Sequence, residues 1–322
     1  MICVAGAAKR HSLNTSAPVM STPLLSKDEI SAAIQRMGRD FTPEILAATY
    51  ALYVPLQERA PKEGVAVTRD IAYGDHARHR LDIFTPAKKP AGASVVVYVH
   101  GGGYVAGERS PRPGLIYDNV PTFFARHGMI GVNITYRLAP EHKWPSGGED
   151  VGRVVAWLHA HIKEFGGDPE RIVLMGQSAG ATHAATWTFI PAVHGPAGPR
   201  IAGAMLLSGV FAPFDAEYHP ENPPAPHRVA YFGVDPAQWP AMNVINHVAS
   251  GHPPVLVSVT EFDPHPLQWS SPALVAALTK CDKRMPWFIY SRNHNHVSPA
   301  MQINSEIDDL GPQLLEFVRS IT

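Results

Sequence analysis

Short apolar runs that alternate with helical segments constrain the fold of this chain more than any other feature of its sequence. A continuous apolar run suits a strand that is buried on both faces of a parallel sheet. Such runs cover residues 94–99, 171–175, 202–208 and 255–260. Apolar residues at helical spacing fill residues 149–165, between the first two runs. The alternation predicts an α/β fold with a mostly parallel central sheet flanked by helices.

Further segments extend this pattern in both directions. Residues 65–84 alternate like two antiparallel strands joined around Gly74–Asp75, and a strand is expected at 128–136. The remaining expected elements are helices at 178–190 and 271–280, a strand at 286–290 and a terminal helix that starts near Ser305.

Charge and hydropathy exclude several classes of partner. The formal net charge is −1, so the chain has no electrostatic footprint for nucleic acid or an acidic membrane. No run of 18 apolar residues is present, so no membrane-spanning helix is expected. The short apolar start of the chain is followed by Lys9 and Arg10, which is the reverse of a secretory signal. We therefore expect a cytoplasmic protein.

The two cysteines are Cys3 and Cys281. Residues 1–22 are expected to be disordered, so a disulfide from Cys3 is not expected, and a reduced cytoplasmic setting fits. No cysteine or histidine grouping has the spacing of a zinc site, and His294 and His296 lie two residues apart without further partners. No metal or cofactor is expected.

Two segments fall outside the strand and helix alternation. Near the N-terminus, Ser26 and Glu29 form a capping-box pattern, and Thr42 before Pro43 marks the start of a second helix. These helices are either a simple packing element or a lid over a site. Residues 211–250 are rich in proline, aromatic residues and histidine and lack a clean period, and a loop of this length within a domain is often functional.

The segment Gly176-Gln177-Ser178-Ala179-Gly180 joins the apolar run 171–175 to a helix. G-x-S-x-G between a strand and a helix is typical of a nucleophile elbow, in which a tight turn holds the serine above the sheet. Flanking glycines relieve the crowding of such a turn. The motif alone arises by chance, but its context makes Ser178 a candidate nucleophile.

A second glycine-rich segment, His100-Gly101-Gly102-Gly103-Tyr104, follows the apolar run 94–99. Glycines leave backbone N–H groups bare, as an oxyanion hole requires. A lone glycine triplet is more often a flexible loop, but its pairing with the elbow favours function. We expect oxyanion donors at Gly102, Gly103 and Ala179, whereas His100 is expected to anchor the loop.

A serine nucleophile needs a histidine base and an acid that orients it, in the chain order Ser, acid, His. The acid should follow the late strand 255–260, where Glu261 and Asp263 are both candidates. Asp263 is preferred because Pro264 can fix the turn that aims it. The base should follow the next strand, where His294 and His296 compete.

Several further segments carry a family resemblance. Together with His100–Gly103 and the elbow, they resemble the bacterial hormone-sensitive-lipase-like esterases and lipases within the α/β-hydrolases, over residues 80 to 310. The segments are Tyr136-Arg137-Leu138-Ala139-Pro140-Glu141-His142, Glu149-Asp150 and Phe165-Gly166-Gly167-Asp168-Pro169-Glu170-Arg171-Ile172.

The resemblance implies an α/β-hydrolase fold and a triad at Ser178, Asp263 and His296. In the family the histidine follows a G-x-x-H pattern, and Asn293 stands in place of that glycine, which favours His296 over His294. Relatives carry two caps, so a lid becomes the preferred interpretation of the N-terminal helices. The expected domains are cap helices at 23–60 and a catalytic domain at 61–322 with a cap insertion at 211–250.

Three positions depart from the family pattern. Gln177 stands before the nucleophile where many members have Asp, and His265 stands where Leu is frequent. The histidine loop reads His294-Asn295-His296-Val297-Ser298 instead of the commoner H-G-F ending. This loop also looks like those of arylformamidases and feruloyl-esterase-like relatives.

These observations predict a serine carboxylic-ester hydrolase that acts on a small-molecule ester. The alternatives are an amidase or arylformamidase-like hydrolase with the same triad, or a non-catalytic ligand binder, against which the retained His296 argues. Some relatives form dimers, so a homodimer stays open. The caps are expected to set specificity. The candidate pocket-lining residues, each of which could equally pack the cap core, are Tyr104, Phe211, Phe214, Tyr231, Phe232 and Trp239.

Overall fold

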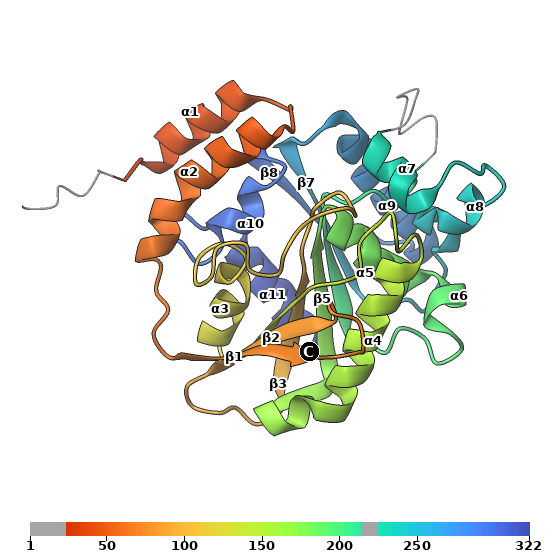
Figure 1. Cartoon of the computed structure of the whole chain (residues 1–322), viewed down its shortest axis with the longest axis horizontal. Helices are drawn as coiled ribbons and strands as arrows, with labels where there is room; N and C mark the ends of the chain where they lie inside the picture. Colours follow the sequence, from red (N-terminus) through yellow and green to blue (C-terminus); the bar gives the residue numbers. More distant parts are fainter. Residues whose placement is uncertain (1–23, 214–224) are drawn as a thin grey trace, which may run out of the picture.

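The computed structural model describes residues 24–213 and 225–322, so the expected disorder of residues 1–22 and the candidate Phe214 lie outside the described residues. Its centre is one eight-stranded sheet in the order β1-β2-β4-β3-β5-β6-β7-β8 (Figure 1). The strands are β1 Val65–Ala72, β2 Arg80–Pro86, β3 Ala93–Val99, β4 Ile130–Ile134, β5 Gly167–Gln177, β6 Gly203–Leu207, β7 Val255–Phe262 and β8 Trp287–Asn295.

Strand direction follows the sequence pattern. The pair β1–β2 and the pair β2–β4 are antiparallel, and every later neighbour in the sheet is parallel. The central strands β3 and β6 are buried along their whole length, because helices cover both faces of the sheet. The predicted mostly parallel sheet is confirmed.

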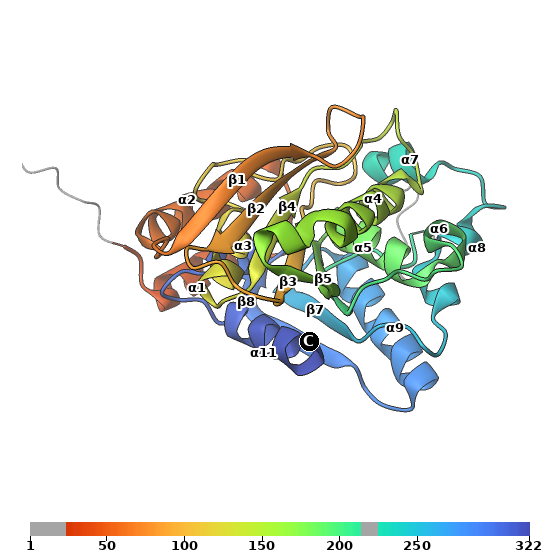
Figure 2. The same ribbon diagram turned by 90° about the horizontal axis from the view of Figure 1, so that it is seen from below.

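Helices pack on both faces of this sheet. One apolar core joins the sheet to α4, α5 and α9, and a second core on the other face joins it to α3 and α11. Figure 2 shows α4 and α11 on opposite sides of β5 and β7. The helices are α1 Lys27–Met37, α2 Pro43–Arg59, α3 Asn119–Arg126, α4 Ser146–His161, α5 Ala179–Phe189, α6 Pro191–His194, α7 Pro226–Phe232, α8 Trp239–Met242, α9 His265–Asp282, α10 Ser298–Gln302 and α11 Gly311–Ile321.

Several element boundaries differ from the sequence expectation, and three of them show why. Helix α9 begins at His265 and continues through Pro272, whereas the sequence predicts a start at residue 271. Strand β8 continues to Asn295, beyond its apolar part, because its polar end still pairs with β7. Helix α11 begins at Gly311, after Asp308 accepts hydrogen bonds from the N–H groups of Leu310 and Gly311.

The two N-terminal helices have the predicted caps. Ser26 and Glu29 form a capping box, and the Thr42 side chain accepts a hydrogen bond from the N–H of Ile45. Figure 1 shows α1 and α2 beside β8, and α7 and α8 on the other side of the same end of the sheet. Within the ranges that the structure describes, no helix has both the length and the apolar character needed to cross a membrane.

Candidate active site

Ser178 lies at the tight turn between β5 and α5. Its φ of 58° is sparsely populated by residues with a side chain, and its N–H donates to the carbonyl oxygen of Leu207 at 2.8 Å. The chain is crowded on both sides of the serine. A Cβ atom at Gly176 would collide with the carbonyl oxygen of Gly180, and one at Gly180 with that of Val99. The turn therefore requires both glycines of the motif.

Ser178, His296 and Asp263 form a continuous chain of hydrogen bonds. The Nε2 atom of His296 lies 2.8 Å from Oγ of Ser178, and Nδ1 lies 2.7 Å from Oδ1 of Asp263. A carboxylate only accepts, so the proton is assigned to Nδ1, and Nε2 is left to accept from the serine hydroxyl. The acid and the histidine are buried, whereas the serine is partly exposed. The arrangement can remove the serine proton when an acyl carbon is attacked.

The second oxygen of Asp263 is also fully engaged. Oδ2 accepts hydrogen bonds from Oγ of Ser208 and from the N–H of Thr260, both at 2.7 Å. These donors stabilise the ionised carboxylate in a buried place and fix its rotamer. Neither Ser208 nor Thr260 is predicted as a site residue from the sequence. The available signal for Ser208 was its position directly after a buried strand, where the other candidate residues also lie.

Glu261 and His294, the alternative candidates for the acid and the base, make contacts away from Ser178. The Glu261 carboxylate accepts from the N–H of Asn293 at 2.8 Å and so ties β7 to β8. Nδ1 of His294 lies 2.8 Å from Oγ of Ser298, and its Nε2 lies 3.5 Å from Oδ1 of Asp309. The structure brings Asp263 and His296, and not this pair, to Ser178.

The glycine loop presents free backbone donors beside Ser178. Gly102 has a φ of 139° and Gly103 a φ of 58°, and a Cβ atom at Gly102 would collide with the carbonyl oxygen of Ala106. Within the described part of the chain, no acceptor is hydrogen-bonded to the N–H groups of Gly102, Gly103 and Ala179. These three groups are the expected oxyanion donors.

His100 is buried beneath this loop. Its Nδ1 lies 2.6 Å from the carbonyl oxygen of Gly101, and its ring stacks on Tyr136 with 4.5 Å between the centroids. The Tyr136 hydroxyl also donates to the His100 carbonyl oxygen at 2.8 Å. Burial lowers the pKa of His100 to about 4, so the ring is neutral at physiological pH. These contacts agree with the expected anchoring role.

Aromatic side chains of the insertion pack against the glycine loop. Tyr104 stacks on Tyr231 with 4.6 Å between the ring centroids and meets Phe232 edge-on. These three rings share one buried cluster with Ala179, and the half-buried Trp239 packs against it. Phe211 lies instead in the main core and is fully buried.

Two further residues reach the site from the loop between α1 and α2. The ring of Phe41 meets that of His296 edge-on, with 5.0 Å between the centroids. Arg39 donates from Nη1 to the carbonyl oxygen of Asp263 at 3.2 Å. Gln177, the residue that departs from the family pattern, donates from Nε2 to the His296 carbonyl oxygen at 2.8 Å. These contacts are not predictable from the sequence, because they join segments that are far apart in the chain.

The glycine loop generates a stability prediction. We expect Gly102→Ala to lower the free energy of unfolding by about 3 kcal/mol or more, because an unfavourable φ adds to the collision with Ala106. Gly198→Ala is the matched control, since its φ of 70° is also left-handed but its surroundings are open, and it should cost about 1 kcal/mol. Urea unfolding measures both losses, and equal losses would contradict the packing described above.

Buried His183, which lies beside Tyr136 and Tyr231, generates a pH prediction. Burial lowers its pKa to about 3, whereas the pKa of an unfolded histidine is about 6.5. Between these two pKa values the histidine is protonated in the unfolded chain but neutral in the folded protein, so the free energy of unfolding falls as the pH falls. Between pH 6 and pH 4 this histidine should contribute about 1 kcal/mol per pH unit to the slope of the unfolding free energy.

His183→Gln should remove that part of the slope, and His161→Gln, on an exposed side chain, should leave it unchanged. The measurement is urea unfolding at a series of pH values. An unchanged slope in His183→Gln would show that the ring takes up its proton in the folded protein.

Relatives with assigned names share part of this sequence. The chain is 30% identical over 227 residues to Esterase LipQ of Mycobacterium tuberculosis, a match that covers 66% of this chain and 53% of LipQ. It is 36% identical over 119 residues to isoprenylcysteine alpha-carbonyl methylesterase ICME of Arabidopsis thaliana, covering 37% and 27% of the two chains. The chain therefore spans about half or less of the length of these relatives.

Solved structures share the fold over almost the whole chain. A hyperthermophilic esterase from the archaeon Pyrobaculum calidifontis superposes with a TM-score of 0.68 at 20% identity and covers 91% of this chain and 96% of its own. An esterase of the bacterial hormone-sensitive lipase family superposes with a TM-score of 0.67 at 21% identity, covering 91% and 97%. The model of the alpha/beta hydrolase fold family Abhydrolase_3 matches residues 96–298, which is more than half of the chain. The predicted fold and family are thereby confirmed, and this chain belongs to the α/β-hydrolase family.

Proposed function

We propose that this chain is a serine carboxylic-ester hydrolase that cleaves small to medium esters through an acyl-enzyme on Ser178. The carrying observation is the chain of hydrogen bonds from Ser178 through His296 to Asp263, at 2.8 and 2.7 Å. The esterase names of the relatives support the ester class. No metal or cofactor takes part in the proposed reaction.

Acylation follows from the site geometry. Oγ of Ser178 attacks the carbonyl carbon of the ester as Nε2 of His296 takes the hydroxyl proton. Asp263 stabilises the imidazolium that forms and keeps its orientation. The carbonyl electron pair moves onto oxygen, where the N–H groups of Gly102, Gly103 and Ala179 can stabilise it. One such donor typically contributes about 3–4 kcal/mol to lowering the barrier.

The intermediate then collapses in two stages. The bond to the alcohol oxygen breaks, and His296 gives its proton to that oxygen, so that the alcohol leaves and the acyl group stays on Ser178. A water molecule then attacks the acyl carbon while His296 takes its proton, and the acid is released as the serine hydroxyl is restored. Each proton taken by Nε2 is returned, so the enzyme ends unchanged.

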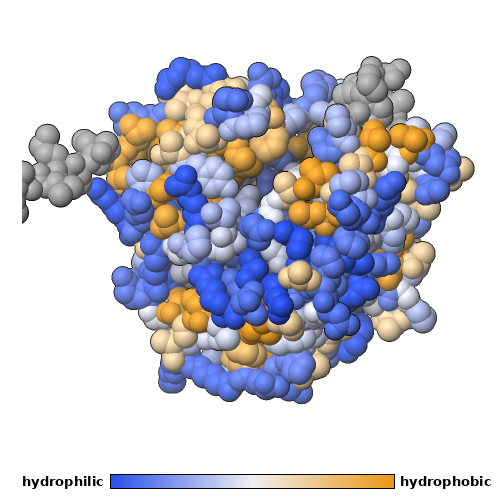
Figure 3. Space-filling model, viewed as in Figure 1, coloured by the Kyte–Doolittle hydropathy of each residue, from blue (hydrophilic) through white to orange (hydrophobic). Residues whose placement is uncertain are grey.

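We propose that two caps on the catalytic domain, which covers residues 61–322, select the substrate. One cap is formed by the helices within residues 23–60, and the other by the insertion at residues 211–250. Phe41 is 50% exposed although its ring contacts His296, so an apolar surface borders the triad. Figure 3 shows apolar residues on both sides of the upper hollow of the molecule, over the N-terminal helices and near α7. These features favour substrates with an apolar acyl or alcohol group.

Ser178→Ala tests the mechanism directly. We expect kcat/KM for p-nitrophenyl acetate to fall at least about 1,000-fold, because the covalent path is lost. Ser250→Ala, at an exposed serine before β7, is the matched control and should keep full activity. His296→Asn should lose as much as Ser178→Ala, and the double variant should lose no more than either, since the two residues act as one unit.

Steady-state kinetics on matched ester and amide substrates completes the test. Faster turnover of the ester supports the proposed substrate class. Faster turnover of the amide or N-formyl amide would instead indicate an amidase that uses the same triad. Full activity of Ser178→Ala would contradict the mechanism, and no turnover by the unmodified protein would favour a ligand binder.

A further inference from the structure

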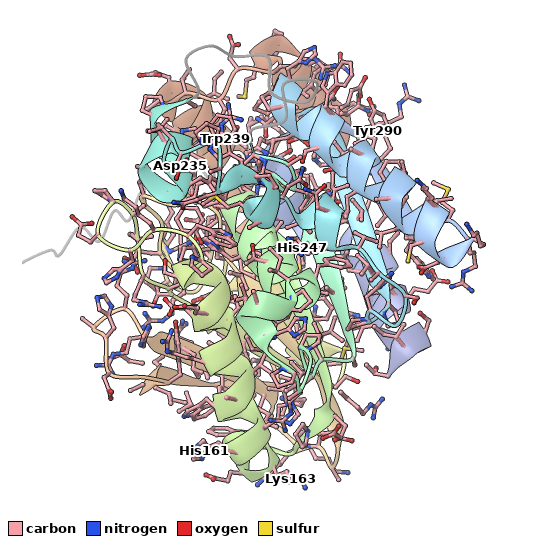
Figure 4. The ribbon with its side chains drawn as sticks, turned by 90° about the vertical axis from the view of Figure 1, so that its right-hand side faces the viewer. His161, Lys163, Asp235, Trp239, His247 and Tyr290 are labelled. Atoms are coloured by element: carbon pink, nitrogen blue, oxygen red, sulfur yellow. The ribbon has the colours of Figure 1, made fainter. Side chains whose placement is uncertain are left out.

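A second group of reactive side chains lies away from Ser178, where α9 ends beside the loop that precedes β7. His252 belongs to this loop, and Cys281 and Asp282 are the last residues of α9. One potential ligand atom from each residue lies within 4.8 Å of the other two. Figure 4 shows α9 as the long light blue helix that runs down one side of the molecule. Sequence spacing does not reveal this group, because His252 lies far from Cys281 and Asp282 along the chain.

The hydrogen bonding of His252 leaves its Nε2 atom able to bind a metal ion. Its Nδ1 lies 2.7 Å from the carbonyl oxygen of Pro253, so Nδ1 carries a proton and donates it. Metal-binding histidines commonly donate their other ring N–H in this way, which fixes the tautomer. The ring packs on Phe189 with 5.3 Å between the centroids, and the side chain is only 10% exposed.

The other ring nitrogen of His252 has no hydrogen-bond partner in the described structure. Nε2 lies 3.2 Å from Oδ2 of Asp282, but the two do not meet in hydrogen-bond geometry. A buried lone pair that faces a carboxylate is unfavourable unless a positive charge lies between them. That charge is either a proton, which would make an ion pair with Asp282, or a metal ion.

Cys281 favours the metal ion, because its sulfur lies within 4.8 Å of a potential ligand atom of His252 and of one of Asp282. A metal ion bound to the thiolate would neutralise the negative charges of the sulfur and of the Asp282 carboxylate. The C-terminal end of α9 adds further negative potential from the helix dipole.

We propose that His252, Cys281 and Asp282 bind one Zn²⁺ ion, with water as the fourth ligand. A donor set of imidazole nitrogen, thiolate sulfur and carboxylate oxygen suits zinc, whereas Mg²⁺ and Ca²⁺ take oxygen ligands. A surface depression of about 710 Å³ is lined by His252, Asp282 and Trp287, so both the ion and a water molecule can reach the group. On binding, the thiol proton passes to solvent and a sulfur–zinc bond forms, without any change of redox state.

The ion has a structural role. Strand β7 begins at Val255 and ends at Phe262, next to Asp263, so the proposed site lies about 25 Å from the triad at ordinary strand rise. The zinc ion would join the start of β7 to the end of α9, which together form one strand–turn–helix unit. Zinc should therefore raise thermal stability and leave ester hydrolysis unchanged.

Cobalt substitution tests the site in the full chain. After chelator dialysis, Co²⁺ should bind with one ion per chain and give the near-ultraviolet absorption of a cobalt–thiolate bond, which excess Zn²⁺ should abolish. Cys281→Ser and His252→Asn should lose this band, and the matched controls Cys3→Ser and His247→Asn should keep it. Turnover of p-nitrophenyl acetate reports folding, and should stay within about twofold of the unmodified protein in all four variants.

Two measurements on the unmodified protein cover the case in which a variant does not fold. Excess Zn²⁺ should raise the melting temperature by about 3 °C or more. It should also slow alkylation of Cys281 by iodoacetamide about tenfold, as followed by peptide mass spectrometry. Absence of the cobalt band, or its persistence in Cys281→Ser, would overturn the proposal. A melting temperature and an alkylation rate that zinc does not change would likewise overturn it and leave a histidine–carboxylate ion pair.

Discussion

The parallel direction of the central strands is the constraint on which the rest of the structure depends. Parallel strands bring their carboxyl ends to one edge of the sheet, so residues that follow different strands meet there. The glycine loop follows β3, Ser178 follows β5, Ser208 follows β6 and Asp263 follows β7. His296 follows β8, the last strand of the sheet. Segments spread over most of the chain thereby share one small site.

The contacts behind this edge keep its polar groups in place. Both oxygens of the Asp263 carboxylate are hydrogen-bonded, so a fully buried charge is compensated and cannot rotate away. Gln177 holds the backbone of His296 from the elbow side, and the Phe41 ring lies against the imidazole from the N-terminal side. The turn that strains Ser178 is thus supported by elements on both sides. Preorganisation of this kind is what electrostatic catalysis requires.

Sequence reasoning predicted the parts of this structure that local pattern encodes. The buried strands, the mostly parallel direction of the sheet and the caps of α1 and α2 follow from apolar periodicity and capping residues. It missed α3 and the start of α9 because proline and short length obscure a helix signal. Contacts such as Ser208 with Asp263 depend on which strands are neighbours, and the cluster of His252 with Cys281 depends on where α9 ends. Neither contact can be predicted from the spacing of residues along the chain.

The central claim is that Ser178 is a nucleophile activated by His296, and one measurement tests it most directly. The intact protein is treated with a fluorophosphonate, digested, and analysed by mass spectrometry to locate the adduct. The account predicts a single adduct on the peptide that carries Ser178, with its formation strongly slowed in His296→Asn. An unmodified Ser178 in protein that hydrolyses esters, or an adduct on another serine, would contradict it.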